Sequence, residues 1–173
     1  RLRNGNLDLA IMALPSEATG MVDSPLYTEK FSIVCPPDHP IAGREDVELA
    51  ELKDLDLLLL DDGHCLRDQV VDLCRHANIN PAEATNSVTR ASSLTTIMQL
   101  VMGGLGCTLV PESALATECH GKDVAIAHFA SDVTAEREVG LVFRSSAARA
   151  EEFREFGTLI TSAYNKAIER SRQ

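Results

Sequence analysis

Two cysteines, nine residues apart, are the residues of this sequence whose type and spacing could do chemistry. Cys65 lies in "DDGHCLRDQ", directly after an acidic turn, and Cys74 lies in "VVDLCRHA". A thiol at a helix N-terminus can ionise near neutral pH, because the helix dipole and nearby cations stabilise the thiolate. A buried thiol instead behaves as a small hydrophobic residue. The two cysteines are therefore either a redox pair or two unrelated side chains.

Some neighbours of Cys65 favour its thiolate form and others oppose it. His64 is adjacent and Arg67 lies within the first predicted turn, so both favour a thiolate. Three carboxylates oppose it: Asp61, Asp62 and Asp68. The sequence leaves this balance open.

The elements that must position these thiols follow from hydrophobic periodicity. Residues 64–78 are predicted to form a helix with Cys74 on its apolar face, preceded by a short buried strand in "DLLLLDDG". A second helix is capped by Ser92 or Ser93 and leads through glycines to a strand at 107–110. Because strands and helices alternate throughout, we expect an α/β fold with mainly parallel sheets.

Composition excludes several classes of protein. The 173 residues are 45% hydrophobic, which is enough for a sizeable core, and the net charge of −10 opposes binding of nucleic acid by this chain. The odd count of five cysteines argues against a secreted disulfide framework. The sequence shows no secretory signal and no membrane-spanning apolar run, so we expect a cytoplasmic protein.

Several motifs together resemble the regulatory domain of LysR-type transcriptional regulators. They are "GNLDLAI", the "DHP" loop, "LLLLDDG" and "GGLGCTLVP" after a Ser-capped helix. Within that family, "DDGHCLRDQ" with Cys74 nine residues after Cys65 looks like the peroxide-sensing members. The resemblance covers nearly the whole chain.

The resemblance implies two Rossmann-like lobes joined by crossover strands, as in periplasmic binding proteins. Residues 1–29 and 138–173 would form lobe I, without its first part, and residues 30–137 would form lobe II with the redox cysteines. The DNA-binding winged helix-turn-helix would lie outside this chain, so DNA would be bound only through that domain. The family further implies a homodimer of regulatory domains, a homotetramer of the full-length protein, and RNA polymerase as a possible partner.

The same resemblance implies a mechanism for the pair. Hydrogen peroxide would oxidise Cys65 to a sulfenic acid, which would form a disulfide with Cys74. On one helix, nine residues correspond to about 13.5 Å of rise, whereas a disulfide needs Cα atoms within roughly 7 Å. The hypothesis therefore requires the helix to unwind and rebuild, which would change the oligomer arrangement and DNA binding.

For the other candidate residues, a purely structural role is the alternative to a functional one. Arg144 ends the strand "EVGLVF" and is either a solvated charge or, by the family resemblance, a support for the thiolate or peroxide. Three residues with hydroxyl side chains lie at a predicted helix N-terminus, where they either cap the helix or bind a small ligand: Ser92, Ser93 and Thr95. The set His64, Cys65, Cys74 and His76 fits no common zinc spacing, so we expect no metal and no cofactor.

Two alternative functions remain open. One is a LysR-type effector-binding domain for a small organic ligand, in which the cysteines have no function. The other is a thiol peroxidase, although the sequence lacks a "CxxC" or other peroxidase motif. We expect a sensor rather than an enzyme.

Overall fold

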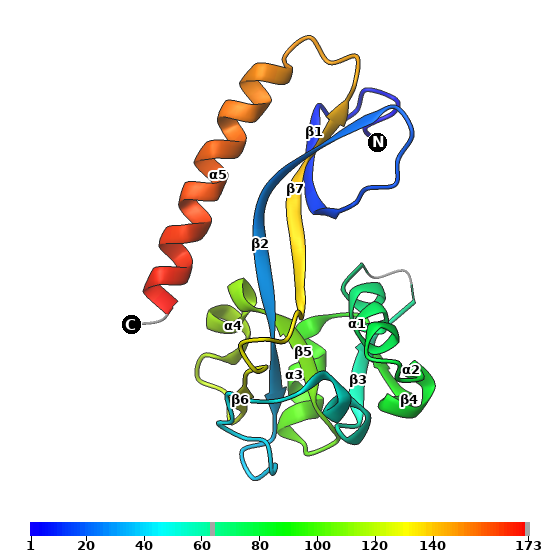
Figure 1. The fold of residues 1–173 in the computed structure, drawn as a ribbon, viewed down its shortest axis with the longest axis vertical. Coiled ribbons are helices and arrows are strands. Elements are labelled where there is room, and N and C mark those ends of the chain that lie inside the picture. Colours follow the sequence, from blue (N-terminus) through cyan, green and yellow to red (C-terminus); the bar gives the residue numbers. More distant parts are fainter. Residues whose placement is uncertain (63–64, 172–173) are drawn as a thin grey trace. The chain divides into compact units, whose positions relative to one another are not determined.

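The computed structural model describes residues 1–62 and 65–171 (Figure 1). Strands and helices alternate along most of the chain, as predicted for an α/β fold. The elements in order are β1 (Leu9–Leu14), β2 (Met21–Cys35), the short 3-10 helix η1 (Leu49–Asp54), β3 (Leu57–Leu60), α1 (Cys65–His76), α2 (Pro81–Ala84), β4 (Thr85–Ala91), α3 (Leu94–Met102), β5 (Thr108–Pro111), α4 (Glu112–Cys119), β6 (Ala125–Ala127), β7 (Glu136–Arg144) and α5 (Ala150–Ser171).

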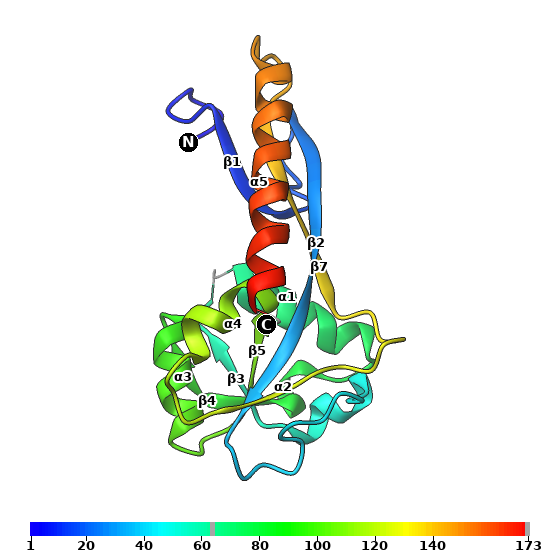
Figure 2. The same ribbon diagram turned by 90° about the vertical axis from the view of Figure 1, so that its left-hand side faces the viewer.

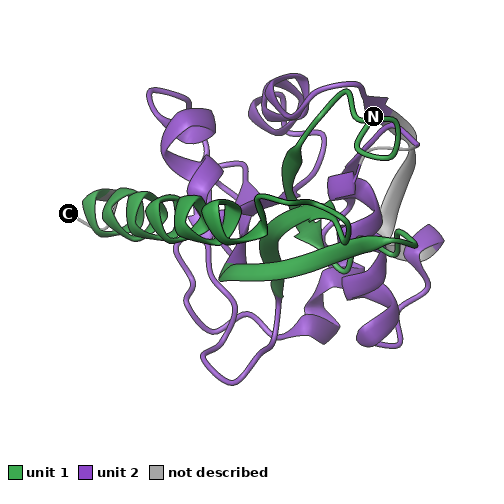
Figure 3. Cartoon of the chain, turned by 90° about the horizontal axis from the view of Figure 1, so that it is seen from above, with its two compact units in different colours: residues 1–29, 136–173 green, residues 30–135 purple. Residues whose placement is uncertain are grey.

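The chain divides into two compact units (Figure 3). Unit 1 consists of Arg1–Glu29 and Glu136–Gln173, and unit 2 consists of Lys30–Ala135. The long strand β2 begins in unit 1 and ends in unit 2. The second boundary lies two residues before the position expected from the sequence.

Unit 2 contains the strand order that positions the two cysteines. β3 pairs in parallel with β4, with Leu60 opposite Ala91, and Leu57 forms a parallel bridge to Cys107 just before β5. These strands are joined through helices, and a helical crossover returns the chain in the same direction. β3 therefore lies between β4 and β5, and Cys65 comes five residues after Leu60, the last residue of β3.

The prediction of mainly parallel sheets is wrong for the other strand pairs. β2 pairs antiparallel with β5 and with β6, and β1 pairs antiparallel with β7. The alternation of strands and helices indicates a parallel pair only when both strands belong to one strand-helix-strand unit. β2 instead runs from unit 1 into unit 2, and β7 lies in unit 1. Neither strand belongs to a strand-helix-strand unit with the strands it pairs with, so no such crossover fixes their direction.

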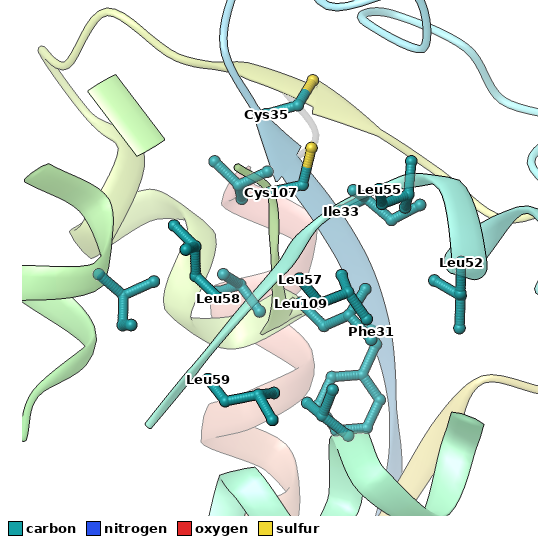
Figure 4. Packing of buried hydrophobic residues seen from close by; sticks show 14 of the residues in the cluster. Phe31, Ile33, Cys35, Leu52, Leu55, Leu57, Leu58, Leu59, Cys107 and Leu109 are labelled. Atoms are coloured by element: carbon teal, nitrogen blue, oxygen red, sulfur yellow. The ribbon is translucent and has the colours of Figure 1, made fainter. Parts of the chain in front are cut away.

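The core of unit 2 is one contiguous apolar cluster (Figure 4). All four residues of β3 are buried, as expected for a strand covered on both faces. The helices α1 and α3 each bury one face against the same cluster. Cys35, Cys74 and Cys107 all lie in this core with no exposed surface.

Unit 1 is built on β1, β7 and the long helix α5, which runs as one uninterrupted helix (Figure 2). Its buried cluster is small and centres on Leu141, Phe143 and Phe153. Gly157 lets α5 approach the strands closely, because a Cβ there would lie 2.7 Å from a Leu26 methyl carbon. Within the described part of the chain, no helix has both the length and the apolar character needed to cross a membrane.

Candidate functional site

Cys65 is the first residue of α1, and its side chain is exposed. The predicted helix over 64–78 is thus confirmed, with the observed bounds Cys65–His76. The first turn also carries Asp68, which suits the positive end of the helix dipole. His64, the predicted neighbour of the thiol, lies outside the residues that the structure describes.

The turn before Cys65 is tied to the sheet by ion pairs. The carboxylate of Asp62 accepts from Arg67 Nε at 2.8 Å and from Arg90 Nη1 at 2.9 Å. Arg67 Nη1 also donates to the carbonyl of Leu60 at 3.2 Å. The Arg67 charge predicted to act on the thiol is therefore engaged by Asp62, and the N-terminal end of α1 is anchored to the ends of β3 and β4.

Cys74 occupies the opposite environment in the last turn of α1. It is fully buried in the apolar core of unit 2, as its place on the apolar face predicted. Burial raises the pKa of the Cys74 thiol, because a thiolate would be desolvated there. Both cysteines are free thiols in this structure.

A complete Schellman motif caps the C-terminal end of α1, and one of its two hydrogen bonds is made to Cys74. The N–H of Ile79 donates to the carbonyl of Cys74 at 2.9 Å, and the N–H of Asn78 donates to the carbonyl of Arg75 at 2.9 Å. Asn78 has φ of 57°, the left-handed conformation that this motif requires. Ile79 is buried in the same core as Cys74. The helix cap therefore closes on the backbone of the buried cysteine.

The spacing on α1 keeps the two sulfurs apart. Because α1 is continuous from Cys65 to His76, the nine-residue separation corresponds to about 13.5 Å of helix rise. A disulfide cannot span that distance without movement of the backbone. The two thiols can pair only if part of α1 unwinds.

Of the three hydroxyl residues predicted at the N-terminus of α3, one caps the helix. Ser93 is the N-cap, and its Oγ accepts from the Thr96 N–H at 3.2 Å. Thr95 Oγ1 donates to a Glu118 carboxylate oxygen at 3.3 Å, and Ser92 is exposed. These contacts do not test a ligand at this place, so that role stays a prediction.

Arg144 belongs to unit 1, whereas Cys65 belongs to unit 2. Its Nη1 donates to the carbonyls of Leu2 and Leu7, the latter at 2.8 Å, and its Nη2 lies 3.8 Å from Asp8. These contacts hold the N-terminal segment of unit 1. The proposed role of Arg144 toward the thiol stays a prediction.

The described residues around α1 include no metal cluster, and a cavity beneath this helix is small. No group of three or more potential metal ligands occurs in the described part of the chain. A cavity beneath α1, lined by residues including Leu60, Leu66 and Val70, measures about 10 Å³. That is close to the space of a single water molecule.

Two residues of this site were not predicted from the sequence. Asn78 follows the basic pair Arg75 and His76, and an Asn just after a basic last turn is a recognised helix stop signal. Arg90 gave no local signal, since it lies 28 residues from the Asp62 that it contacts.

Comparisons with known proteins agree on one family. The model of the LysR substrate binding domain matches residues 1–164. A probable hydrogen peroxide-inducible genes activator from Mycobacterium avium is 48% identical over 159 residues, covering 92% of this chain and 50% of that protein. The DNA-binding transcriptional dual regulator OxyR of Escherichia coli (strain K12) is 38% identical over 144 residues, covering 83% of this chain and 46% of that protein.

Solved structures give the same result. A cysteine mutant of Corynebacterium glutamicum OxyR with bound H2O2 matches with a TM-score of 0.94 at 60% identity, covering 97% of this chain and 52% of that chain. The oxidised form of Corynebacterium glutamicum OxyR matches with a TM-score of 0.82 at 57% identity, covering 99% and 52%. The chain thus spans about half the length of the relatives it matches.

Proposed function

Since this chain belongs to the LysR substrate-binding domain family, we propose that it is the peroxide-sensing regulatory part of a LysR-type transcription regulator. The observation that carries the proposal is the placement of the two thiols on α1. One is exposed at the first residue of the helix, and the other is buried under its C-terminal cap. The names of the similar proteins, among them a peroxide-inducible genes activator, support the same proposal.

The chemistry proceeds in two steps that balance. The Cys65 thiolate attacks one oxygen of hydrogen peroxide, so that the O–O bond breaks, Cys65 becomes a sulfenic acid and hydroxide leaves as water after protonation. The Cys74 sulfur then attacks the sulfenic sulfur, forming the disulfide and releasing a second water. In sum, two thiols and one peroxide give one disulfide and two waters.

The second step supplies the signal, because it is incompatible with an intact α1. Cys74 must leave the core, the cap at Asn78 and Ile79 must open, and the helix must unwind before the sulfurs meet. The disulfide therefore selects a different conformation of this segment. This structure matches the cysteine mutant with a TM-score of 0.94 and the oxidised form with a TM-score of 0.82. The better match to the mutant supports the proposal that a continuous α1 belongs to the reduced protein.

Partners and location belong to the same proposal. By family membership we propose that regulatory domains pair as homodimers, that the complete protein is a homotetramer in the cytoplasm, and that DNA is bound through a separate domain. RNA polymerase is the partner expected of an activator. His64 and Arg144 are proposed to support the thiolate or the peroxide, and Ser92, Ser93 and Thr95 a small ligand.

The test combines peptide mass spectrometry with two variants. Reduced protein receives a brief stoichiometric pulse of hydrogen peroxide, and a Cys65–Cys74 disulfide that dithiothreitol reverses is expected. Cys74→Ser should stop at a sulfenic acid on Cys65, whereas Cys65→Ser should leave Cys74 reduced. The Cys119→Ser variant is the control and should behave as the parent protein does.

Two outcomes would contradict the proposal. If the disulfide formed while hydrogen-exchange protection over residues 65–76 stayed unchanged, the switch would be wrong. If both thiols stayed reduced and the melting temperature instead rose with a small organic ligand, independent of reductant, the effector-binding alternative would replace it. Repeated turnover of peroxide with a thiol reductant would favour a peroxidase.

A further inference from the structure

Unit 2 holds a second pair of cysteines that neither the motif nor the proposed switch uses. Cys35 is the last residue of β2, and Cys107 directly precedes β5. The register of these antiparallel strands runs from Phe31 opposite Pro111 to Val34 opposite Thr108. The next residue along each strand continues the same register, so Cys35 lies opposite Cys107.

The backbone contacts of Cys107 define the type of this pair. Its N–H donates to the carbonyl of Asp56, and its carbonyl accepts from the Leu58 N–H at 2.8 Å. Both backbone groups of Cys107 therefore point toward β3 and away from β2. Cys35 and Cys107 are consequently a non-hydrogen-bonded pair, in which the Cα atoms of opposite residues lie about 4.5 Å apart.

This geometry suits a disulfide bond. Disulfides join Cα atoms that are roughly 4.4–6.8 Å apart, and directly opposite residues point to the same face of an antiparallel pair. Figure 4 shows both side chains, with their sulfur atoms pointing in the same direction. No helix has to unwind for these sulfurs to meet, in contrast to the pair on α1.

We propose that Cys35 and Cys107 form a second oxidisable dithiol, which closes to a cross-strand disulfide within the core of unit 2. The oxidant is a peroxide. One thiolate attacks the peroxide and becomes a sulfenic acid as the O–O bond breaks, and the neighbouring sulfur then displaces hydroxide from it. Two thiols and one hydrogen peroxide thus yield one disulfide and two waters.

Burial makes this pair slow to react. Both thiols have no exposed surface, and the Cys35 thiol lies 3.7 Å from the Ala125 carbonyl, which it can reach as a donor. Burial, together with the nearby Cys35 and Asp56, raises the pKa of Cys107 to about 12. Cys35 also pairs with Ala125 of β6, and Cys107 is hydrogen-bonded to Asp56 and Leu58, so this part of the sheet must open before peroxide can enter. We therefore expect it to oxidise only after prolonged exposure or in mild denaturant, long after Cys65.

The Cys65→Ser variant isolates this reaction, because it removes the exposed thiol without touching the core. The folded variant is held with excess hydrogen peroxide in urea below its unfolding transition, and thiols are mapped by peptide mass spectrometry over time. The proposal expects the Cys35 and Cys107 thiols to disappear with one common rate constant. They should appear as one linked peptide that has lost two hydrogens, and dithiothreitol should restore both thiols.

Single-thiol controls separate pairing from independent oxidation. In Cys65→Ser/Cys35→Ala, Cys107 should lose its thiol as a sulfenic or higher acid without an intrachain link, and Cys65→Ser/Cys107→Ala should do the same at Cys35. The proposal is overturned if Cys35 and Cys107 of the Cys65→Ser protein oxidise at different rates to unlinked acids. It is equally overturned if both remain thiols when hydrogen exchange shows that the ends of β2 and β5 have opened. Because these readouts do not involve Cys65, their result is independent of the proposed sensing reaction.

Discussion

The two ends of α1 are held by different kinds of contact. At the first end, Arg67 and Arg90 meet the exposed carboxylate of Asp62, and the thiol of Cys65 is exposed. At the second end, the Schellman motif and the buried side chains of Cys74 and Ile79 provide the hold. Exposed ion pairs contribute little stability, whereas buried apolar contacts contribute much. The end that carries the exposed thiol is therefore held by polar contacts, and the end that carries the buried thiol is held by the apolar core.

Thiol labelling gives the largest expected difference between the two ends. Iodoacetamide at neutral pH should modify Cys65 at least about 100-fold faster than Cys74, because a buried thiol reacts only when the structure opens locally. Mass spectrometry of quenched samples measures both rates. Similar rates in the folded protein would show that the C-terminal end of α1 does not protect its thiol.

Truncation of the apolar contact should weaken the second end. Ile79→Ala is expected to lower the free energy of unfolding by about 2–4 kcal/mol, because it leaves a cavity beside Cys74. Ile79→Val is the matched control and should cost about 1 kcal/mol. Urea unfolding measures both, and labelling of Cys74 should accelerate in the same order. Unchanged stability of Ile79→Ala would mean that this contact does not hold the cap.

Alkaline pH should act on the buried thiol of Cys74. Burial raises the folded-state pKa of Cys74 above its ordinary value of 9.0, so the folded protein keeps this proton when the unfolded chain has lost it. The contribution to stability is present below about pH 9 and is lost as pH rises through the folded pKa. Cys74→Ala should therefore flatten the decline of the unfolding free energy above pH 9. An unchanged decline in Cys74→Ala would contradict this expectation.

The left-handed residue of the cap permits a smaller and sharper test. Asn78→Ala should destabilise unit 2 by about 1 kcal/mol, because an alanine at φ of 57° is strained. Asn78→Gly keeps the motif and should be neutral or slightly stabilising. Disulfide formation after a peroxide pulse should be faster in Asn78→Ala than in Asn78→Gly. Equal rates in the two variants would show that opening of the cap does not limit the second step.

The smallest effect on stability is expected at the first end. Asp62→Asn removes the carboxylate shared by Arg67 and Arg90 and should cost less than about 1 kcal/mol, because its side chain is 73% exposed. Thermal unfolding measures this change. A loss of several kcal/mol would show that the charged end is as important to the fold as the apolar one.

Local sequence patterns predicted the elements around the site well. The periodicity of Leu66, Val70 and Leu73 marked α1, and the serine before an apolar stripe marked the cap of α3. These signals were sufficient because each depends on residues within one or two turns. The place of Cys74 in the core followed from the same periodicity.

Long-range contacts could not be predicted in this way. The ion pair between Asp62 and Arg90 depends on the parallel pairing of β3 with β4, which brings together residues 28 positions apart. The antiparallel pairing of β2 with β5 joins residues that lie far apart in the sequence, so no local motif indicates it. The opposition of Cys35 and Cys107 follows from that same register, and their separation in sequence gave no indication of it.

The continuous helix between Cys65 and Cys74 also has a consequence in time. A sulfenic acid on Cys65 must wait until α1 opens, and during this waiting period a cellular reductant can return it to the thiol. After a brief or weak exposure to peroxide, the sulfenic acid would be reduced before the disulfide forms, whereas sustained exposure would lead to the disulfide. On the proposed function, the stability of the C-terminal cap sets the length of this delay, so α1 would act as a low-pass filter on peroxide.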